Sequence, residues 1–424
     1  MKSNIPASLW HATAPAWREL SPLSGACNVD VAVVGGGYTG LSSALHLAEG
    51  GASVALLEAE QIGFGASGRN GGQVNPGLRV GRDGLRQKFG VESGDRIYAI
   101  AESAPDRLFE LVARLSLDCD AARPGAVKLA HTPQSADALH ATAEAMTRNG
   151  VAARFLDRAK VASELGTERY AAGLLDPRGG ALHPLRYARA LADAAIRAGA
   201  RLHERSPARS LERSSDGWEL ATPDGIVRSH HVVFGANAYT DSLLSGLRET
   251  ILPVNSFQIA TEPLSPELDR LVLPGGHTAH DTRRLILYFR KGPQDRIVLG
   301  GRASFSSGQR DKDYAVLSRV LVDIFPRLTG VRVDHAWSGL VGITRDFLPH
   351  YHAPASGLHV IVGFNGRGVA KATTMGQLIS DHILGRAAMP WPAMPVAPIP
   401  LHRWREPVLN IVMGYHAIMD RFGR

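Results

Sequence analysis

Residues 29–60 combine two short apolar segments with a glycine-rich turn and a helical pattern between them. The first apolar segment is too short and too rich in β-branched residues to favour a helix, so we expect a buried strand. Gly35, Gly37 and Gly40 follow it, and apolar residues then recur at helical intervals until a glycine pair ends the helix. A second apolar segment ends at Glu58. The pattern predicts a βαβ unit, and hence an α/β fold with a parallel sheet.

The spacing of these glycines predicts a nucleotide site at the start of the helix. The first glycine permits a tight turn, the second lets the backbone approach a pyrophosphate, and the third allows close packing of helix and strand. The helix N-terminus, at Tyr38 and Thr39, would face the phosphates, because its backbone N–H groups and its dipole favour an anion. Glu58 stands where a carboxylate accepts hydrogen bonds from ribose hydroxyls. The sequence therefore predicts an adenine-linked dinucleotide without a 2′-phosphate.

Composition limits the classes of protein that remain. The chain has 424 residues, of which 44% are hydrophobic, enough for a full core and two or three domain-sized units. The formal net charge is +7, but the basic residues are scattered, so we expect no nucleic-acid partner. There is no apolar run of about 18 residues, so we expect no transmembrane segment. Two cysteines without a disulfide or metal spacing favour a reducing, cytoplasmic location and no metal site.

Two further glycine-rich loops extend the predicted cofactor site. "GASGRNGGQV" (65–74) closely follows the βαβ unit, and "GFNGRGV" (363–369) stands between a predicted strand and a predicted helix. Either loop alone is also compatible with a surface turn or a close helix–sheet contact. Together they favour FAD over a nicotinamide, because FAD is longer and must also be held at its flavin end. The candidate cofactor-binding residues outside the βαβ unit are Ala66, Ser67, Arg69, Asn70, Gly71, Gly72, Gln73, Gly235, Asn237, Gly363, Gly366, Arg367, Gly368 and Val369.

Strands of a second type occur later in the chain. Residues 252–264, 283–290 and 295–301 are long and half-polar, a pattern typical of an antiparallel sheet with one covered face. We therefore expect a Rossmann-like FAD-binding domain with an inserted α+β substrate domain built on an antiparallel sheet. The expected FAD-binding domain comprises residues 1–84, 182–245 and 332–424, and the expected substrate domain comprises residues 85–181 and 246–331.

Several blocks of the chain occur together in one family. They are the GxGxxG unit with Glu58, "GFGASGRNGGQV" (63–74), "GGALHPLRYARALADAA" (179–195), "GANAY" (235–239), "WSG" (337–339) followed by Pro349, and "GFNGRGV" (363–369). In combination they resemble the D-amino-acid-oxidase superfamily of flavoproteins, and most of all its γ-glutamylputrescine oxidases. The resemblance implies FAD and oxidation of a C–N bond to an imine. Hydride would pass from the carbon beside the amine nitrogen to flavin N5, water would hydrolyse the imine to an aldehyde, and O2 would reoxidise the flavin to give H2O2.

The resemblance also bears on how the flavin is held and on what reoxidises it. Relatives that attach flavin covalently use a cysteine in the segment that here spans 337–352, or a histidine in the loop that here spans 68–71. This chain has neither residue at those places, so we expect noncovalent FAD. The alternative to an oxidase is a dehydrogenase of amines or amino acids that passes electrons to a quinone or a partner protein, with residues 406–424 as a docking tail. A flavin-binding protein without catalytic activity is a third class.

The substrate-binding candidates are few, because flavin chemistry needs no catalytic triad and no metal. Tyr288 and Arg290 would point to one face of a strand by their period-two spacing. His183 would either act in the pocket or cap the helix that follows it. Arg290, Arg302 and Arg367 suit an acidic group on the substrate amine, because a guanidinium binds a carboxylate and repels a polyamine. The full candidate set is His183, Tyr288, Arg290, Arg302, Trp337, Thr344 and Arg367.

Overall fold

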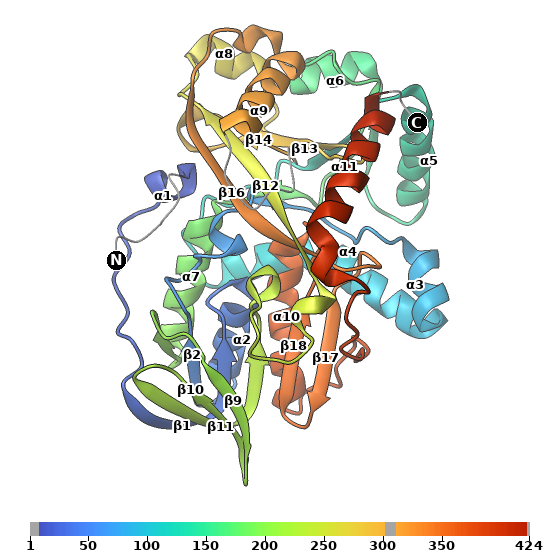
Figure 1. Ribbon diagram of the computed structural model, residues 1–424. Coiled ribbons are helices and arrows are strands. Elements are labelled where there is room, and N and C mark those ends of the chain that lie inside the picture. Colours follow the sequence, from blue (N-terminus) through green and yellow to red (C-terminus); the bar gives the residue numbers. More distant parts are fainter. Residues whose placement is uncertain (1–7, 302–310, 422–424) are drawn as a thin grey trace.

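The computed structural model describes residues 8–301 and 311–421, with two large sheets (Figure 1). The first sheet contains the strands β1 (Gly25–Val34), β2 (Val54–Leu57), β8 (Arg201–His203), β9 (Ser210–Ser214), β10 (Gly217–Ala221), β11 (Gly225–Phe234), β17 (His350–Ala355) and β18 (Leu358–Val362). Its main order is β17-β18-β11-β1-β2-β8, and β10 and β9 join through β11. β1 pairs in parallel with β2, as the βαβ pattern predicts, and also with β11.

Helices cover one face of this sheet. They are α2 (Tyr38–Glu49), α4 (Val91–Arg114), α7 (Pro184–Arg197) and α10 (Gly368–Ile383). α2 is buried along almost its whole length, because both α10 and α7 pack against it. Gly376 makes the contact with α10 possible, since a Cβ there would lie 2.6 Å from the backbone oxygen of Thr39. Small residues at every fourth position of α10 predict such a close approach.

The second sheet is mostly antiparallel. Its strands, in spatial order, are β16 (Val333–Ile343), β12 (Leu252–Thr261), β15 (Ile297–Gly301), β14 (Tyr288–Lys291), β13 (Thr278–Asp281), β4 (Ala126–Ala130), β6 (Ala172–Asp176) and β5 (Arg154–Leu156). β13 and β4 form the one parallel pair of this order. The three half-polar segments expected to be strands each contribute one, although the strand within 283–290 begins only at Tyr288. A short pair, β3 (Gln73–Val74) with β7 (Gly180–Ala181), lies apart from both sheets.

The two faces of the second sheet differ. One apolar core covers the outer face, where α6 (Arg158–Leu165), α8 (Pro266–Leu271) and α9 (Asp311–Ile324) pack on side chains such as Phe257 and Phe289. Side chains alternate along a strand, so Gln258, Tyr288 and their in-register neighbours point to the inner face. The inner face is covered at one end by α5 (Pro133–Arg148) and at the other by α1 (Leu9–Thr13). The cavity described below lies between these two ends.

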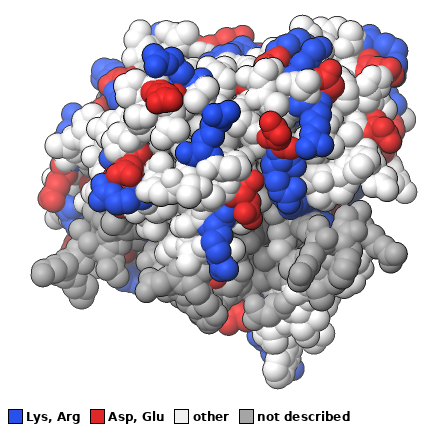
Figure 2. All heavy atoms as spheres, turned by 90° about the horizontal axis from the view of Figure 1, so that it is seen from above, with Lys and Arg blue, Asp and Glu red and all other residues white. Residues whose placement is uncertain are grey.

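The surface above the second sheet carries charges of both signs. Figure 2 shows Lys and Arg side chains interspersed with Asp and Glu over this face. The absence of a nucleic-acid partner stays a prediction. Within residues 8–301 and 311–421, no helix combines the length and the apolar character that crossing a bilayer requires. The cytoplasmic location also stays a prediction.

Two segments pack with a different sheet from the one that the expected domain ranges assign to them. α3 (Arg82–Phe89) and α4 contribute to the core under the first sheet, although most of their residues fall in the range assigned to the substrate domain. β16 pairs along its whole length with β12 in the second sheet, although it falls in the range 332–424. Sheet pairing joins segments that are distant in the chain, so sequence order alone does not locate such boundaries. The division into an FAD-binding and a substrate domain stays a prediction.

The C-terminal segment forms a helix, α11 (Arg405–Arg421), which crosses the second sheet beside β12 and β16 in Figure 1. Its Leu409 packs with apolar residues of those two strands. Ile411, Val412 and Tyr415 are exposed instead. The helix therefore presents apolar side chains to solvent on the part that does not contact the sheet.

We predict that Gly40→Ala destabilises the protein. A Cβ at this position would lie 2.0 Å from the backbone oxygen of Gly35, and no side-chain rotation can relieve that overlap. Overpacking of this kind costs about 1–3 kcal/mol of the free energy of unfolding. Gly414→Ala is the control, because a Cβ there meets nothing within 4 Å on an exposed helix. Urea unfolding of both variants measures the difference, and equal stability of Gly40→Ala and the unchanged protein would contradict the packing argument.

Candidate active site

A cavity of about 490 Å³ lies between the ends of the parallel strands and the inner face of the second sheet. Val34, Leu57 and Phe234, the last residues of β1, β2 and β11, line it on one side. Open α/β sheets bind ligands in the crevice beyond the carboxyl ends of their strands. The cavity therefore lies where the βαβ pattern predicts a nucleotide.

The first glycine turn has the arrangement that its spacing predicts. Gly35 has a φ of +107° and lines the cavity, and Gly37 lines it as the N-cap of α2. Tyr38 and Thr39 also line the cavity. Gly40 does not, because it packs against the preceding turn. The helix N-terminus thus opens onto the cavity, as binding of a pyrophosphate requires.

Glu58 lines the same cavity directly after β2. Its carboxylate accepts hydrogen bonds from the backbone N–H of Gly36 at 2.6 Å and of Glu60 at 2.9 Å. Burial raises the pKa of Glu58, while these two bonds favour its charged form. Each carboxylate oxygen has a further lone pair, so the group can accept from a ligand hydroxyl as well. The position fits the predicted ribose contact.

The polar residues of the loop 65–74 fold the loop upon itself. Asn70 donates to the carbonyl oxygens of Ala66 and Ser67, at 3.1 and 2.9 Å, and accepts from the backbone N–H of Gly72 at 2.7 Å. Gly72 itself does not line the cavity, because it packs against the backbone oxygen of Leu182. The predicted residues of this loop that do line the cavity are Ala66, Ser67, Arg69, Asn70, Gly71 and Gln73.

The glycine-rich loop near the C-terminus, residues 363–369, also contributes to the cavity lining. Gly366, Arg367, Gly368 and Val369 line it, together with Gly235 and Asn237. Gly363 has a supporting position instead: its N–H donates to Asn237 Oδ1 at 2.8 Å, and its φ of +81° requires a glycine.

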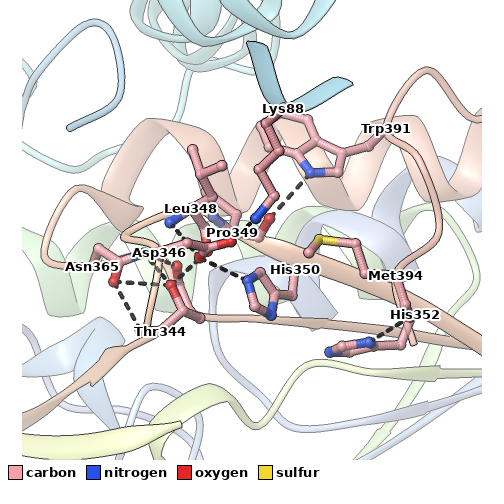
Figure 3. A network of polar contacts seen from close by, with 11 residues as sticks. Lys88, Thr344, Asp346, Leu348, Pro349, His350, His352, Asn365, Trp391 and Met394 are labelled. Atoms are coloured by element: carbon pink, nitrogen blue, oxygen red, sulfur yellow. Dashed lines mark hydrogen bonds and ion pairs between the residues drawn. The ribbon is translucent and has the colours of Figure 1, made fainter. Parts of the chain in front are cut away.

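A network of polar contacts holds this loop in place (Figure 3). The Thr344 N–H donates to Asn365 Oδ1 at 2.9 Å, and its hydroxyl donates to the carbonyl of Leu348 at 2.8 Å. The Leu348 N–H donates to Asp346, which also accepts from Lys88 on α3. Thr344 does not line the cavity. Its contacts place it in the support of the glycine loop, and a direct role in the pocket has no support from its position.

One row of the second sheet contributes Gln258, Tyr288 and His280 to the opposite wall. Register joins six residues across six neighbouring strands, and their side chains share the inner face: Trp337, Gln258, Gly300, Tyr288, His280 and Lys128. Gly300 makes room for its neighbour, because a Cβ there would lie 2.2 Å from the ring of Tyr288. The Tyr288 hydroxyl hydrogen-bonds that of Ser256 at 2.9 Å. Tyr288 also lines the cavity, as the sequence predicts.

Of three other candidates predicted from the sequence, two do not line the cavity and one lies outside the described residues. Trp337 is fully buried and donates from Nε1 to the Arg69 carbonyl at 2.9 Å. Arg290 shares its strand face with Tyr288, as period two predicts, but lies behind Gly72 with its guanidinium carbon 5.1 Å from the Trp10 ring. Burial lowers the pKa of Arg290 to about 10, so it stays charged at neutral pH. Arg302 lies outside the described residues.

His183 is a helix cap, which is one of the two roles that its position before a proline allowed. Its Nδ1 accepts from the backbone N–H of Arg186 at 3.2 Å, and its Nε2 lies 3.0 Å from the Thr13 hydroxyl. Burial, with Arg290 nearby, lowers the pKa of His183 to about 3. A neutral ring suits the cap, because only an unprotonated Nδ1 can accept. His183 does not line the cavity.

Sequence reasoning missed several residues that line the cavity. Asn75 and Arg79 follow the glycine-rich loop directly, and that closeness is the signal that could have found them. His280 has no such signal, because only strand pairing brings it beside Tyr288. The missed lining residues include Asn75, Arg79, Tyr239, Ser256, Gln258, His280, Phe364 and Asn365.

Several polar atoms of this wall fit a bound cofactor or substrate. Asn75 Oδ1, Gln258 Oε1 and both ring nitrogens of His280 are buried and have no hydrogen-bond partner in the described structure. All three residues line the cavity. A buried polar group without a partner loses its hydration, so a ligand that supplies the missing hydrogen bonds is favoured. Glycine turns together with unpartnered polar groups in one lining thus fit a dinucleotide and a polar substrate.

Comparison with known proteins relates this site to flavoenzymes. The family profile described as FAD dependent oxidoreductase (DAO) matches residues 30–382, which is most of the chain. γ-Glutamylputrescine oxidoreductase of Escherichia coli (strain K12) is 31% identical over 422 residues, covering 98% of this chain and 99% of that protein. Probable oxidoreductase OrdL of Rhizobium meliloti (strain 1021) is 32% identical over 427 residues, covering 98% of each.

A solved structure supports the fold. Glycine oxidase from Geobacillus kaustophilus matches with a TM-score of 0.74 at 23% identity, covering 88% of this chain and 99% of that one. The resemblance inferred from the sequence blocks is confirmed, and FAD is the cofactor. The chain belongs to the DAO family of FAD-dependent oxidoreductases.

Proposed function

We propose that this enzyme oxidises a primary or secondary amine that also carries an acidic group, with γ-glutamylputrescine as the first candidate. Bound FAD would supply the acceptor for a hydride from the carbon beside the amine nitrogen, and O2 would be the final oxidant, giving H2O2. Water hydrolyses the resulting imine to an aldehyde. The observation that carries the proposal is the charge of the cavity. Arg79 and Arg367 line it, and neither forms an ion pair within residues 8–301 and 311–421.

The residues that would hold FAD come from three parts of the chain. Gly35 and Gly37 open the N-terminus of α2 toward a pyrophosphate, and Glu58 would accept from the ribose. The loop 65–73 and the loop 366–369 would enclose the remainder, because both line the same cavity. Gln258 Oε1, an acceptor without a partner in the described chain, fits a ligand with N–H groups, which the flavin ring has.

The distribution of charge in the cavity favours an acidic substrate over a free polyamine. The carboxylates among its described lining residues are Glu58, Glu60 and Asp241, which belong to segments next to the first sheet. The lining residues contributed by the second sheet include no acid. A polyamine would therefore meet Arg79 and Arg367 without a compensating carboxylate, whereas an acidic group would pair with them. In this proposal the second sheet, which supplies Tyr288, serves as the substrate domain.

A dehydrogenase that passes electrons to a quinone or a partner protein is the second candidate. The observation in its favour is the apolar surface of α11, where Ile411 and Tyr415 are 74% and 55% exposed. An exposed apolar helix face suits a protein or membrane contact. Electron transfer to such a partner would replace the reaction with O2 and leave amine oxidation unchanged.

The test of the proposed function is a screen of the holoenzyme against amines, polyamines, γ-glutamyl derivatives, amino acids and aminophosphonates. We expect kcat/KM for γ-glutamylputrescine to exceed that for putrescine at least about tenfold, since one ionic hydrogen bond alone supplies that difference. H2O2 formation and flavin bleaching without O2 are the two measurements. Bleaching without H2O2 would favour the dehydrogenase. A flavin that no amine bleaches would contradict both and leave a flavin-binding protein without catalysis.

We predict that FAD is bound noncovalently. Neither Cys27 nor Cys119 lines the cavity, and the loop segment at which relatives attach FAD through a histidine has none. Acid precipitation should therefore release yellow FAD into the supernatant, with an absorbance that matches the flavin content of the holoenzyme. Flavin that stays with the washed pellet would show a covalent bond.

We predict that Glu58→Ala weakens FAD binding about tenfold or more, because a hydrogen bond to a charged group contributes about 1.5–3 kcal/mol. Titration of the apo-protein with FAD measures the dissociation constant. Glu168→Ala is the matched control, because Glu168 is exposed and does not line the cavity. The same FAD affinity in both variants would remove Glu58 from the cofactor site. The substitution also removes the hydrogen bonds to Gly36 and Glu60, and a melting curve of the apo-protein shows whether their loss destabilises the fold.

A further inference from the structure

We propose that Glu204 is a positioning residue of the FAD site, and that it fastens the N-terminal segment 14–24 to this site. Glu204 does not line the cavity, so it acts through residues that do. The inference rests on the proposed contact of Glu58 with the ribose. It goes beyond that contact, because it assigns a role to a buried carboxylate and to a segment that carry no cofactor motif.

The carboxylate of Glu204 holds two separate segments of the chain. The residue follows β8 and is 0% exposed. Its Oε1 accepts from the Ile62 N–H at 2.8 Å and from Trp17 Nε1 at 2.9 Å. Its Oε2 accepts from the Leu20 N–H at 3.2 Å. Arg189 is near enough for its charge to interact with that of Glu204, but within residues 8–301 and 311–421 the two form no ion pair. The buried carboxylate thus depends on these N–H donors, and their positions depend on it.

Ile62 carries the effect of Glu204 to the glycine turn. Its side chain is buried and packs on Gly36, where a Cβ would lie 2.8 Å from Ile62 Cδ1. The next residue, Gly63, donates from its N–H to the Gly36 carbonyl at 3.0 Å. The two glycines that flank Gly36 line the cavity. A fixed Ile62 therefore helps to fix the turn at which we expect the pyrophosphate.

The backbone around Glu204 also supports Glu58. The Glu58 N–H donates to the His203 carbonyl at 2.9 Å, and the Glu58 carbonyl accepts from the Ser206 N–H at 2.8 Å. These bonds continue the parallel pairing of β2 with β8 past the last residues of the two strands. Residues 207–208 come next and line the cavity together with Glu58. Glu204 thus lies within a segment that both holds Glu58 and reaches the cavity.

Trp17 and Leu20 belong to a segment that connects the two sheets. It runs from α1 to β1, and Figure 1 shows it along one side of the molecule. α1 packs against the second sheet through Trp10, which shares an apolar cluster with Val298. Because Trp17 and Leu20 both donate to Glu204, this carboxylate is the point at which the segment meets the cofactor side of the first sheet. Loss of the carboxylate would release the segment from the loop after β2.

The charge of Glu204 acts on Glu58 as well. Burial raises the pKa of Glu58 first of all, the backbone N–H groups of Glu60 and Gly36 lower it, and the charges of Glu60 and Glu204 raise it further. Removing the charge of Glu204 therefore lowers the pKa of Glu58. A ribose hydroxyl donates to the ionised carboxylate, so FAD binding weakens as the pH falls through this pKa. Loss of the Glu204 charge moves this acid limit of binding to lower pH.

The experiment titrates the apo-protein of the full chain with FAD over a range of pH. Glu204→Gln keeps the size of the side chain but loses its charge, and its amide group opposes one of the N–H donors. At neutral pH we expect the dissociation constant of FAD to rise about tenfold, the effect of a weakened bond to a charged group. The acid limit of binding should move to lower pH at the same time. A fold that is merely damaged would bind FAD less well at every pH, with the acid limit unchanged. Glu204→Asp, which retains the charge, should keep the acid limit of the unchanged protein.

Trp17→Phe tests the link to the N-terminal segment. It removes the indole N–H and keeps an aromatic ring, so the dissociation constant of FAD should rise about threefold, as for the loss of one hydrogen bond. Combined with Glu204→Gln it should add little, because both substitutions weaken the same bond. Trp218→Phe is the matched control, since Trp218 donates to the Ser356 carbonyl at 3.2 Å and does not line the cavity. Glu212→Gln, at an exposed residue outside the lining, controls for the loss of a negative charge.

Glu58→Ala separates the inference from the contact on which it rests. If Glu58→Ala weakens FAD binding but Glu204→Gln does not, the inference is overturned and the ribose contact stands. An unchanged acid limit in Glu204→Gln also overturns the inference. If Glu58→Ala has no effect, the ribose contact and the inference fail together, whereas the oxidation of amines is decided by the substrate screen. Melting temperatures of the apo-proteins identify misfolding. Should Glu204→Gln fail to fold, Trp17→Phe decides, because an unchanged dissociation constant in that variant overturns the inference.

Discussion

The backbone carbonyl of Arg69 fastens the glycine-rich loop after the βαβ unit to the second sheet. It accepts hydrogen bonds from Gln258 Nε2 at 2.5 Å and from Trp337 Nε1 at 2.9 Å, so the second sheet holds the glycine-rich loop that follows the βαβ unit. That loop has four glycines within residues 65–74, and ordering glycine costs more backbone entropy than ordering any other residue. Two donors fixed on paired strands offset part of this cost. The two hydrogen bonds therefore fix the position of the loop relative to the second sheet.

The two ends of the cavity recognise charge by different means. At the first sheet, backbone N–H groups of a helix N-terminus and one carboxylate, Glu58, suit a phosphate and a ribose. Elsewhere in the lining, the side-chain cations Arg79 and Arg367 stand without acidic partners in the described chain. Partly buried charges interact more strongly than exposed ones, because less water screens them. The cavity therefore offers favourable contacts to anionic groups at more than one place along its lining.

The glycine turn that opens onto the cavity could be predicted, whereas the positions of several polar candidates could not. Gly35 and Gly37 are identified by spacing alone, because a tight turn and a close backbone approach admit no side chain. Trp337 and Thr344 belong to conspicuous blocks of the chain, yet they support neighbouring loops from outside the cavity lining. A short motif shows that a residue is near a site, but the direction of its side chain depends on the strand or loop that carries it. Any part of these residues in substrate binding stays a prediction.

The sequence by itself determined the βαβ unit with its glycine turn, because local spacing of glycines and apolar residues encodes it within 29–60. It also determined the family, through the combination of blocks that extends to residue 369. Only the tertiary structure decided which side chains of the second sheet lie side by side on its inner face. His280 and Lys128 are distant in the chain and carry no motif, and the parallel pairing of β13 with β4 makes them neighbours. Register is the physical reason: a shift by one residue turns every side chain of a strand to the other face. No local pattern in these two short strands specifies that register.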